Sequence, residues 1–312
     1  MAEANEPAKE AAAGADKAAV AAEVGRVSYE ALKSASAMVK PGVRLIDVAE
    51  HAEGFLKQKG FGIAFPLNIS VNEQAAHYTP SLGDEKLFGD KDVVKLDFGA
   101  EKDGILGDCA LTIDLSGNNG KLLEAAQAAL SDAIATVRAG VKVRDIGAAI
   151  AKAIEKRGLK PIRNLGGHGV GEHELHSSVF VPNYDNGDDT ELTDGMTIAI
   201  EPFATDGRGM VSDGDFYEIY DYIGEFSVRS PAARKVLSEI EAKYPHDPFA
   251  VRWLAGSAQS KFGLYAAVRE LLAADAIRAY PVLVELGNGL VSQFESELLV
   301  EKDGCRVLTG PA

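Results

Sequence analysis

The chain has 312 residues, of which 46% are hydrophobic and 25% are charged, and its formal net charge at pH 7 is -15. A chain of this length and composition can bury a large core, as one big domain or as two ordinary ones. Its negative charge argues against binding nucleic-acid phosphates or anionic lipids through bulk electrostatics.

Cysteine usage and hydropathy also exclude several classes of protein. The two cysteines, Cys109 and Cys305, are too few for a disulfide framework or a cysteine-based zinc site, which suits a reducing compartment, so we expect a cytoplasmic protein. No uncharged apolar run reaches the roughly 18 residues that a membrane-spanning helix needs. Residues 1–20 lack the apolar core of a signal peptide and are predicted to form a flexible, solvated tail.

The chain contains an internal repeat, because Val39–Phe61 can be laid over Val137–Leu159 without a gap. In both copies a helix ends near a glycine, an aspartate stands near the start of the next amphipathic helix, and another glycine stops that helix. The equivalent pairs are Val39 and Val137, Gly42 and Gly140, Val43 and Val141, Asp47 and Asp145, and Gly60 and Gly158.

Each copy of the repeat continues into an apolar strand that ends in a carboxylate. Asp97 ends DKDVVKLD and Glu201 ends DGMTIAIE. A period of about one hundred residues is too long for a solenoid, so the sequence predicts an α+β fold made of two pseudo-symmetric halves. Chance similarity between generic helices is the alternative, and the shared register of the glycines and acids argues against it.

The first half also contains a predicted β-hairpin. Val93–Gly99 and Ile105–Ile113 are strand-like and flank a Lys-Asp-Gly turn at 102–104. With a two-residue loop, the residue numbers of two paired residues sum to an odd number. Asp97 and Asp108 therefore lie on one face of the hairpin, either directly opposite each other or one diagonal apart. Two acids on an apolar face are costly to bury unless a cation compensates them. A solvent-facing pair is the alternative, which the surrounding apolar residues disfavour.

Histidines in the two halves are candidates for different roles. His168 follows a glycine pair that would let the backbone approach closely, and a neutral imidazole is a common metal ligand. His77 lies close to where the repeat places His176, so the duplication could aim both imidazoles at one cleft as donors or proton carriers. The remaining histidines, His51, His173 and His246, are predicted to be ordinary surface or core residues.

Two glutamates complete the candidate set. Glu201 closes an apolar strand and is followed by Pro202, and Glu295 opens another apolar run. Taken alone, either glutamate could face solvent. Together with Asp97, Asp108 and His168 they form an oxygen-rich set that suits two divalent ions, which can generate hydroxide at neutral pH and polarise a scissile carbonyl.

These motifs, in this order and spacing, resemble the type II methionine aminopeptidases of the pita-bread metallopeptidase fold. The resemblance runs through AFPLNIS, NEQAAHYTP, KLDFG, GDCALT, NLGGHG, AIEPFAT and VSQFE. It implies a catalytic domain at 21–225 and 286–312, with a helical inserted subdomain at 226–285. Residues 232–244 and 265–277 there have the apolar spacing of helices. The N-terminal region lacks a long charged block and so resembles the archaeal form.

The resemblance implies a methionyl aminopeptidase. Such an enzyme removes the initiator methionine from nascent proteins and peptides with a small second residue, by attack of a metal-bridging hydroxide on the scissile carbonyl. Asp97 would bind one ion in a bidentate manner, Asp108 and Glu295 would bridge, and His168 and Glu201 would complete the other. Co, Mn, Fe and Zn all tolerate such a set.

The resemblance also implies the remaining site residues and the partners. His77 and His176 would be catalytic residues flanking the metals, one binding substrate near the scissile amide and the other stabilising the tetrahedral intermediate. Phe65, Leu175 and Tyr280 would line the methionine pocket, although composition alone makes them core residues. The expected partner is the N-terminal methionine of nascent polypeptides. Docking on the ribosome is compatible with this role, and a monomer is expected.

Two departures from the family pattern and two other functions bear on this hypothesis. Ser296-Glu297 stands where the family usually has His-Thr, and Ser177-Ser178 where it has Ala-Gly, which affects the ligands' surroundings and the pocket width.

A prolidase or Xaa-Pro aminopeptidase shares the fold and the metal set, but the AAHYTP segment, the Tyr280-Pro-Val stretch and the helical region favour the methionine enzymes. A metal-free binding protein of this fold would have lost ligands that are present here.

Overall fold

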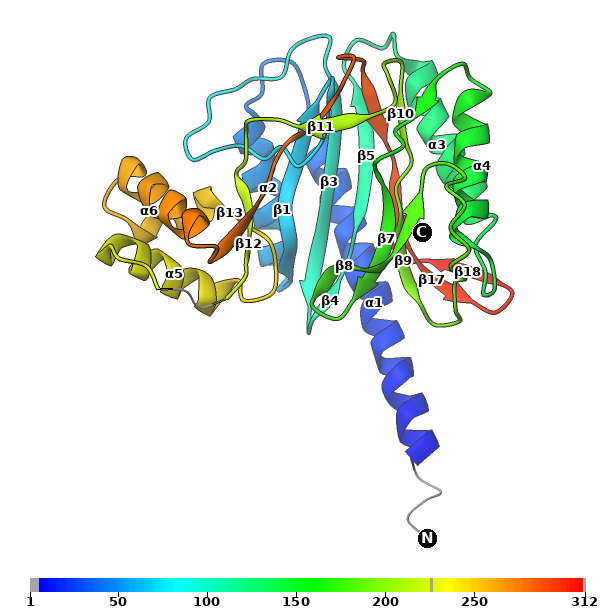
Figure 1. The fold of residues 1–312 in the computed structure, drawn as a ribbon, viewed down its shortest axis with the longest axis horizontal. Coiled ribbons are helices and arrows are strands. Elements are labelled where there is room, and N and C mark those ends of the chain that lie inside the picture. Colours follow the sequence, from blue (N-terminus) through cyan, green and yellow to red (C-terminus); the bar gives the residue numbers. More distant parts are fainter. Residues whose placement is uncertain (1–5, 225–226, 311–312) are drawn as a thin grey trace.

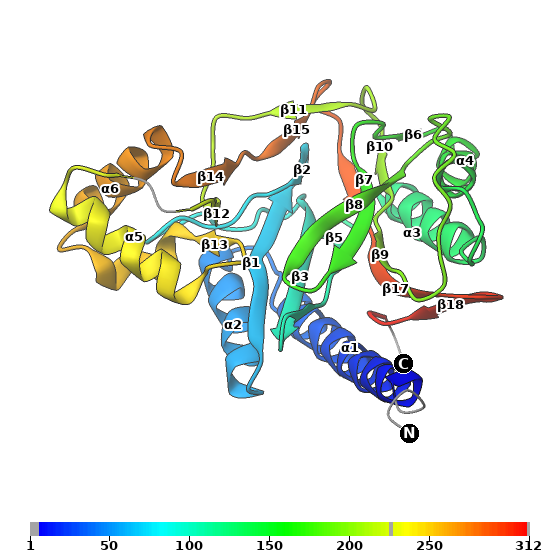
Figure 2. The same cartoon turned by 60° about the horizontal axis from the view of Figure 1, so that its bottom comes forward.

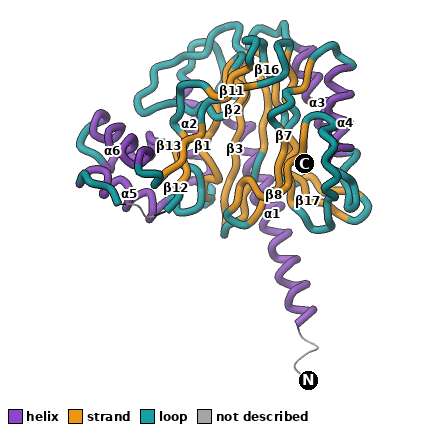
Figure 3. Tube along the Cα trace, in the orientation of Figure 1, coloured by secondary structure: helices purple, strands orange, loops and turns teal. Residues whose placement is uncertain are grey.

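The computed structural model describes residues 6–224 and 227–310, which fold around one curved antiparallel sheet. Figure 1 shows the strands in the middle of the molecule, and Figure 3 shows helices at both sides of them. The path through the sheet is β1-β3-β5-β17-β9-β7-β8, with β4 paired to β3 and β18 to β17. The strands are β1 (Gly62–Val71), β3 (Val93–Lys102), β4 (Ile105–Leu106), β5 (Cys109–Asp114), β7 (Gly166–Gly171), β8 (Glu174–Pro182), β9 (Thr197–Ile200), β17 (Glu295–Glu301) and β18 (Gly304–Val307).

Two pairs of helices cover the sheet, one pair for each half of the chain. Helices α1 (Glu6–Ser36) and α2 (Leu45–Gln58) lie together against β3 and β1, as Figure 2 shows. Helices α3 (Gly120–Ile134) and α4 (Val143–Glu155) pack on each other, and α4 contacts β8. Each pair buries its apolar stripe in a separate hydrophobic cluster, where every fully buried aliphatic side chain contributes roughly 1.5–3 kcal/mol. The α+β class and the two-part organisation follow the sequence prediction.

The backbone of the two halves repeats at the glycines found in the sequence. Gly42 and Gly140 have φ of 81° and 79°, and their N–H groups donate to the carbonyls of Phe88 and Leu192 in equivalent positions. Gly60 and Gly158, with φ of 81° and 65°, follow α2 and α4. Since glycine adopts this left-handed conformation without the strain of a Cβ, the same residue ends both helices.

A lateral unit lies at one side of the sheet, which we call the α5–α6 lobe (Figure 1). It packs two helices and a 3-10 helix on a small sheet of order β13-β12-β14, around its own hydrophobic cluster. The Ser230 and Ser260 hydroxyls cap α5 and α6 by accepting from Ala233 N and Gly263 N. Both predicted helices are therefore present. The lobe's elements are β12 (Ile219–Tyr222), α5 (Pro231–Lys243), β13 (Phe249–Ala250), the 3-10 helix η2 (Val251–Ser257), α6 (Lys261–Ala273) and β14 (Ile277–Tyr280).

Two further three-stranded sheets connect the halves, in the orders β16-β10-β6 and β11-β15-β2. At the N-terminal side, α1 already begins at Glu6, so much of the segment predicted as a solvated tail is helical, and residues 1–5 lie outside the described residues. Among the helices of the described residues, none combines the length and the hydropathy that a membrane span requires. The short strands are β2 (Gln74–Ala76), β6 (Lys160–Pro161), β10 (Phe203–Thr205), β11 (Val211–Asp213), β15 (Leu283–Glu285) and β16 (Val291–Gln293).

Candidate metal centre

The predicted hairpin brings Asp97 and Asp108 to one face of the sheet. Asp97 pairs with Ala110, and Lys102 pairs with Ile105, so the residue numbers of each pair sum to an odd number, as predicted. Asp108 lies in the interruption between β4 and β5, two residues before Ala110 and therefore one diagonal from Asp97. Because the strand is interrupted here, the backbone N–H and C=O of Asp108 form no hydrogen bonds with β3. They bond instead to the side chains of Glu297 and Thr309.

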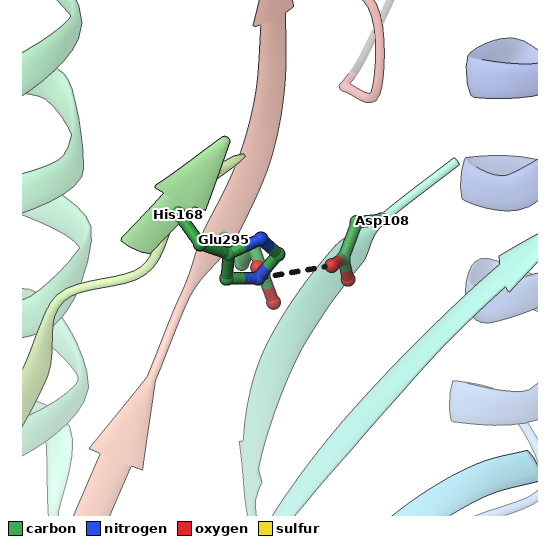
Figure 4. Close-up of side chains that lie close together, drawn as sticks. All are labelled: Asp108, His168 and Glu295. Atoms are coloured by element: carbon green, nitrogen blue, oxygen red, sulfur yellow. Dashed lines mark ion pairs between the residues drawn. The ribbon is translucent and has the colours of Figure 1, made fainter. Parts of the chain in front are cut away.

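Asp108, His168 and Glu295 form a compact cluster from three separate segments of the chain (Figure 4). One donor atom from each lies within 4.8 Å of the other two, and the residues are 3%, 8% and 4% exposed. The His168 Nε2 atom is 3.5 Å from Asp108 Oδ2. A buried imidazole between two carboxylates is a donor set that suits a borderline divalent ion.

Glu201 and Asp97 adjoin this cluster. The Glu201 Oε1 atom lies 3.9 Å from His168 Nε2, and Gln293 Nε2 donates to Glu201 Oε2 at 3.2 Å and to Glu295 Oε2 at 3.3 Å. The Asp97 Oδ1 atom is buried and has no hydrogen-bond partner. An orphaned buried carboxylate oxygen is costly unless a cation binds it. The residues present therefore fit a metal centre.

The electrostatics of the four carboxyl groups support the same conclusion. Burial raises the pKa of Asp97 to about 7. Burial, reinforced by the neighbouring carboxylates, raises the pKa of Asp108, Glu201 and Glu295 well above their usual values. Four acids this close cannot all carry charge at neutral pH without compensation. Two divalent cations would supply four positive charges to the group.

His168 is oriented and kept neutral by its surroundings. Its Nδ1 lies 3.2 Å from the Gly169 carbonyl oxygen, which fixes Nδ1 as the donor and leaves Nε2 to face the acids. Burial lowers the pKa of His168 to about 3. A Cβ added at Gly167 would lie 2.1 Å from the Ala199 carbonyl oxygen, so the glycine before His168 permits the predicted close approach of β7 to β9.

His77 and His176 line the same cleft as the five clustered residues, as the duplication predicts. His77 has a φ of 68°, its Nδ1 lies 3.1 Å from the Pro281 carbonyl oxygen, and burial lowers its pKa to about 4. The His176 ring packs edge-on against His168 with centroids 4.4 Å apart, and burial in the cleft lowers its pKa as well. Both imidazoles are thus neutral at pH 7. Their catalytic roles stay predictions.

The cleft has a volume of about 340 Å³. Its lining includes all three residues predicted for the methionine pocket, Phe65, Leu175 and Tyr280. Leu175 is in contact with the cluster of Phe65 and Leu106, and the Tyr280 ring lies 5.5 Å from that of His77, centroid to centroid. An apolar wall therefore stands directly beside the carboxylate cluster. The wall also contains Ala76, Leu165, Phe203, Ile219, Pro248 and Leu283.

Gln293 and Thr309 hold the ligands in place without being predicted for the site, and so does Glu297, which the sequence singles out only as a departure from the family pattern. Gln293 bonds two of the acids, and its position two residues before Glu295 on an extended chain was the available signal. Glu297, 2% exposed, accepts from Asp108 N at 3.0 Å, and Thr309 Oγ1 donates to Asp108 O at 2.8 Å. No local pattern in the sequence points to Thr309.

Comparison with known proteins agrees with this geometry. The model of metallopeptidase family M24 matches residues 20–231. The chain is 40% identical to the methionine aminopeptidase of Methanocaldococcus jannaschii over 287 residues, which is 92% of this chain and 96% of that protein. Among solved structures, a thermophilic Arx1 superposes with a TM-score of 0.80 at 17% identity, covering 93% of this chain and 90% of its own. The methionine aminopeptidase of Thermotoga maritima superposes with a TM-score of 0.68 at 23% identity, covering 93% and 95%.

Proposed function

The chain belongs to metallopeptidase family M24, its function is that of a methionine aminopeptidase, and we propose that it works with two divalent ions held by Asp97, Asp108, His168, Glu201 and Glu295. The observation that carries the function is similarity to a methionine aminopeptidase over 92% of the chain. The buried donor cluster supports the metal chemistry. When bound, such ions lower the pKa of water to near neutrality and polarise a carbonyl oxygen. Co, Mn, Fe and Zn all suit this donor set.

We assign His77 to the scissile amide. Because its Nδ1 must donate to the Pro281 carbonyl oxygen to make that hydrogen bond, its neutral ring leaves Nε2 as an acceptor. An acceptor beside the cluster can bind the amide N–H of the bond to be cleaved. His176, on β8, is assigned to donate a hydrogen bond to the substrate oxygen that gains negative charge in the tetrahedral intermediate.

The apolar wall of the cleft accounts for the choice of methionine. Phe65, Leu175 and Tyr280 offer an aromatic and aliphatic surface without a charged group, which suits an unbranched thioether side chain. Sulfur also makes favourable contacts with aromatic rings. The second residue of the substrate would lie toward the mouth of the cleft, where a small side chain is expected to be tolerated best.

The broader assignments belong to the same proposal. We propose that the α5–α6 lobe is the inserted subdomain of type II enzymes. We also propose that the physiological substrate is the initiator methionine of nascent chains, which would place the protein in the cytoplasm and near the ribosome. A single chain contains every residue assigned to the site, which is consistent with action as a monomer.

Hydrolysis of defined peptides tests the function. The chain, loaded with Mn, Co, Fe or Zn under reducing anaerobic conditions, should release methionine from Met-Ala-Ser and leave Ala-Pro peptides intact. The converse specificity would establish a prolidase instead. A failure to bind about two ions per chain in any of these loadings, together with no hydrolysis, would favour a metal-free binding protein. Glu295→Gln is the matched control and should abolish turnover.

A further inference from the structure

Two histidines outside the carboxylate cluster lie side by side, each close in sequence to residues that line the cleft. His173 is in the turn between β7 and β8, and His246 is in the loop between α5 and β13. Their ring centroids are 4.7 Å apart and their planes are inclined by 43°. Both side chains are exposed, so the pair is open to solvent. The sequence predicts only ordinary positions for them, because they lie 73 positions apart in the chain.

The environment of this pair is acidic. Asp247 follows His246, its Oδ1 atom is buried without a hydrogen-bond partner, and burial followed by the charge of Glu101 raises its pKa to about 6. The Glu101 carboxylate accepts from the Gly104 N–H at 2.9 Å, so it lies at the hairpin against which the His173 ring packs. A cation next to the two rings would be attracted by both carboxylates.

The His173 ring is held in place by the hairpin between β3 and β4. The backbone N–H of His173 donates to the Gly104 carbonyl oxygen at 2.8 Å, and His173 has a φ of 55°. A Cβ added at Gly104 would lie 2.5 Å from the Nε2 atom of His173, so the ring packs directly on that glycine. The position of one imidazole is therefore set by the main sheet, and that of the other by the α5–α6 lobe.

We propose that His173 and His246 bind a borderline transition-metal ion, such as Zn²⁺ or Cu²⁺, at a second site separate from the five-residue cluster. Zinc–nitrogen bonds are about 2.0–2.1 Å long, so two imidazole nitrogens on one tetrahedral ion lie roughly 3.3 Å apart. The two ring centroids are 4.7 Å apart, which is close enough for one ion to bind a nitrogen from each ring. Asp247 is the nearby carboxylate that stabilises the charge, and water completes the coordination.

An ion at this site would connect the two walls of the cleft. Pro248, next to Asp247, lines the cleft from the lobe side, and Leu175 and His176 line it from the β7–β8 hairpin. Joining His173 to His246 would restrain the lobe against this hairpin. Binding of an ion by His173 and His246 requires neither a particular substrate nor occupancy of the carboxylate cluster.

Zinc titration of the full chain tests the proposal. Calorimetry should show one more equivalent of Zn²⁺ in the wild-type protein than in His173→Asn, where asparagine tolerates the φ of 55°, or in His246→Ala. His51→Ala is the matched control, because His51 is exposed and pairs with Ser34 on the far helices, and it should keep the full number. Equal stoichiometry and affinity in the wild type and both variants would overturn the proposal. Unchanged thermal unfolding of the two variants shows that they fold.

The second arm separates this site from the catalytic cluster. In the Glu295→Gln background the additional equivalent should persist, and bound Cu²⁺ should give an electron paramagnetic resonance spectrum with nitrogen couplings from two imidazoles. Adding His246→Ala should remove those couplings. Retention of two-nitrogen coupling without His246 would refute the site. Hydrogen exchange of residues 169–176 should slow when the additional ion binds to the wild type, and should be unaffected in His246→Ala.

Discussion

At the scale of single residues, the buried carboxyl groups carry protons that a metal must displace. The pKa of Asp97 is raised to about 7, and those of Asp108, Glu201 and Glu295 are raised as well. Metal binding near pH 7 is therefore expected to release protons, and the affinity for the metal should rise with pH. Calorimetry in two buffers of different ionisation enthalpy measures the number released. A binding enthalpy that is independent of the buffer would contradict the assignment.

The same shifts determine how the metal-free protein responds to pH. An acid whose folded pKa exceeds its unfolded value binds more protons when folded, so the free energy of unfolding falls as pH rises through that interval. For Asp97 the interval runs from its ordinary value of 3.8 to about 7. The metal-free protein, prepared with a chelator, should thus lose stability as the pH rises across this range. Bound metal should abolish this loss. Thermal unfolding at fixed pH steps, with and without chelator, provides the measurement.

His77 offers a test of catalysis separate from metal binding. Removing its imidazole should leave about two bound ions and lower turnover by roughly 10²- to 10⁴-fold, the usual range for a positioned hydrogen-bonding or proton-transfer group. Because His77 has a φ of 68°, His77→Asn is a better variant than His77→Ala, since asparagine tolerates the left-handed region. Turnover at the wild-type rate in both variants would refute the assigned role.

The sequence determined some of these residues better than others. The placement of Asp97 and Asp108 on one face follows from the length of the hairpin loop alone, because side chains alternate between the two faces along each strand. Asp97 and Glu201 were related by the repeat. His168 and Glu295 rested mainly on family resemblance, and the contact between His173 and His246 was not foreseen. Contacts across long stretches of chain depend on how segments pack, and a single sequence contains no local signal for that.

At the scale of elements, the 3-10 helix η2 anchors the segment that carries His77. Arg252 Nη1 donates to Thr79 Oγ1 at 2.8 Å and to the Pro80 carbonyl oxygen at 3.0 Å, while its Nη2 pairs with Glu53 on α2. Both charged groups are nearly fully buried, at 7% and 4% exposure. The ion pair therefore joins the α5–α6 lobe, helix α2 and the loop that follows His77.

Replacing Arg252 should weaken both stability and turnover. Arg252→Met would remove the ion-pair partner of the buried Glu53 carboxylate and leave only the Trp253 indole N–H, which donates to it at 2.8 Å, at a cost of about 3–5 kcal/mol in the free energy of unfolding. Turnover should fall further than the folded fraction explains, because Thr79 and Pro80 lose their anchor. The double variant with Glu53→Leu should recover stability and not turnover. Lys235→Ala, an exposed change on α5 of the same lobe, is expected to shift stability by less than about 0.5 kcal/mol.

Helices were easier to predict than the sheet order. The apolar period of the α5 segment matched the structure closely. Helix α6 begins four residues before the predicted 265–277 segment because Ser260 caps it, and it ends at Ala273, shortly before Asp275 at φ 56°. The path β1-β3-β5-β17-β9-β7-β8 brings β17 between the halves, and local patterns do not encode such a long-range pairing.

At the scale of the whole molecule, the carboxylate cluster lies where the two halves meet. Asp97 and Asp108 come from the first half, and His168 and Glu201 come from the second. Strand β17 pairs with β5 of one half and β9 of the other, and Glu295 is its first residue. Bound metal would therefore crosslink both halves and stabilise the whole fold by mass action.

Segments from both ends of the described chain also support the ligand Asp108. Helix α1 packs against β3, and a Cβ added at Gly25 would lie 2.3 Å from the Leu308 carbonyl oxygen. Next to Leu308, the Thr309 hydroxyl accepts from Glu297 N at 2.6 Å and donates to Asp108 O at 2.8 Å. One buried hydroxyl thus connects the last described residues to a predicted metal ligand about two hundred positions earlier.

Thr309→Val tests this connection, because valine keeps the shape of threonine and removes only the hydroxyl. The change leaves Asp108 O and Glu297 N without a partner, which should lower the free energy of unfolding by about 1–3 kcal/mol. Metal affinity should fall by roughly tenfold or more, as when outer partners of other metal ligands are removed. Thr309→Ser keeps the hydroxyl and should retain near wild-type affinity. Equal affinity in the valine and serine variants, measured by calorimetry on folded protein, would show that Thr309 only stabilises the fold and does not position Asp108.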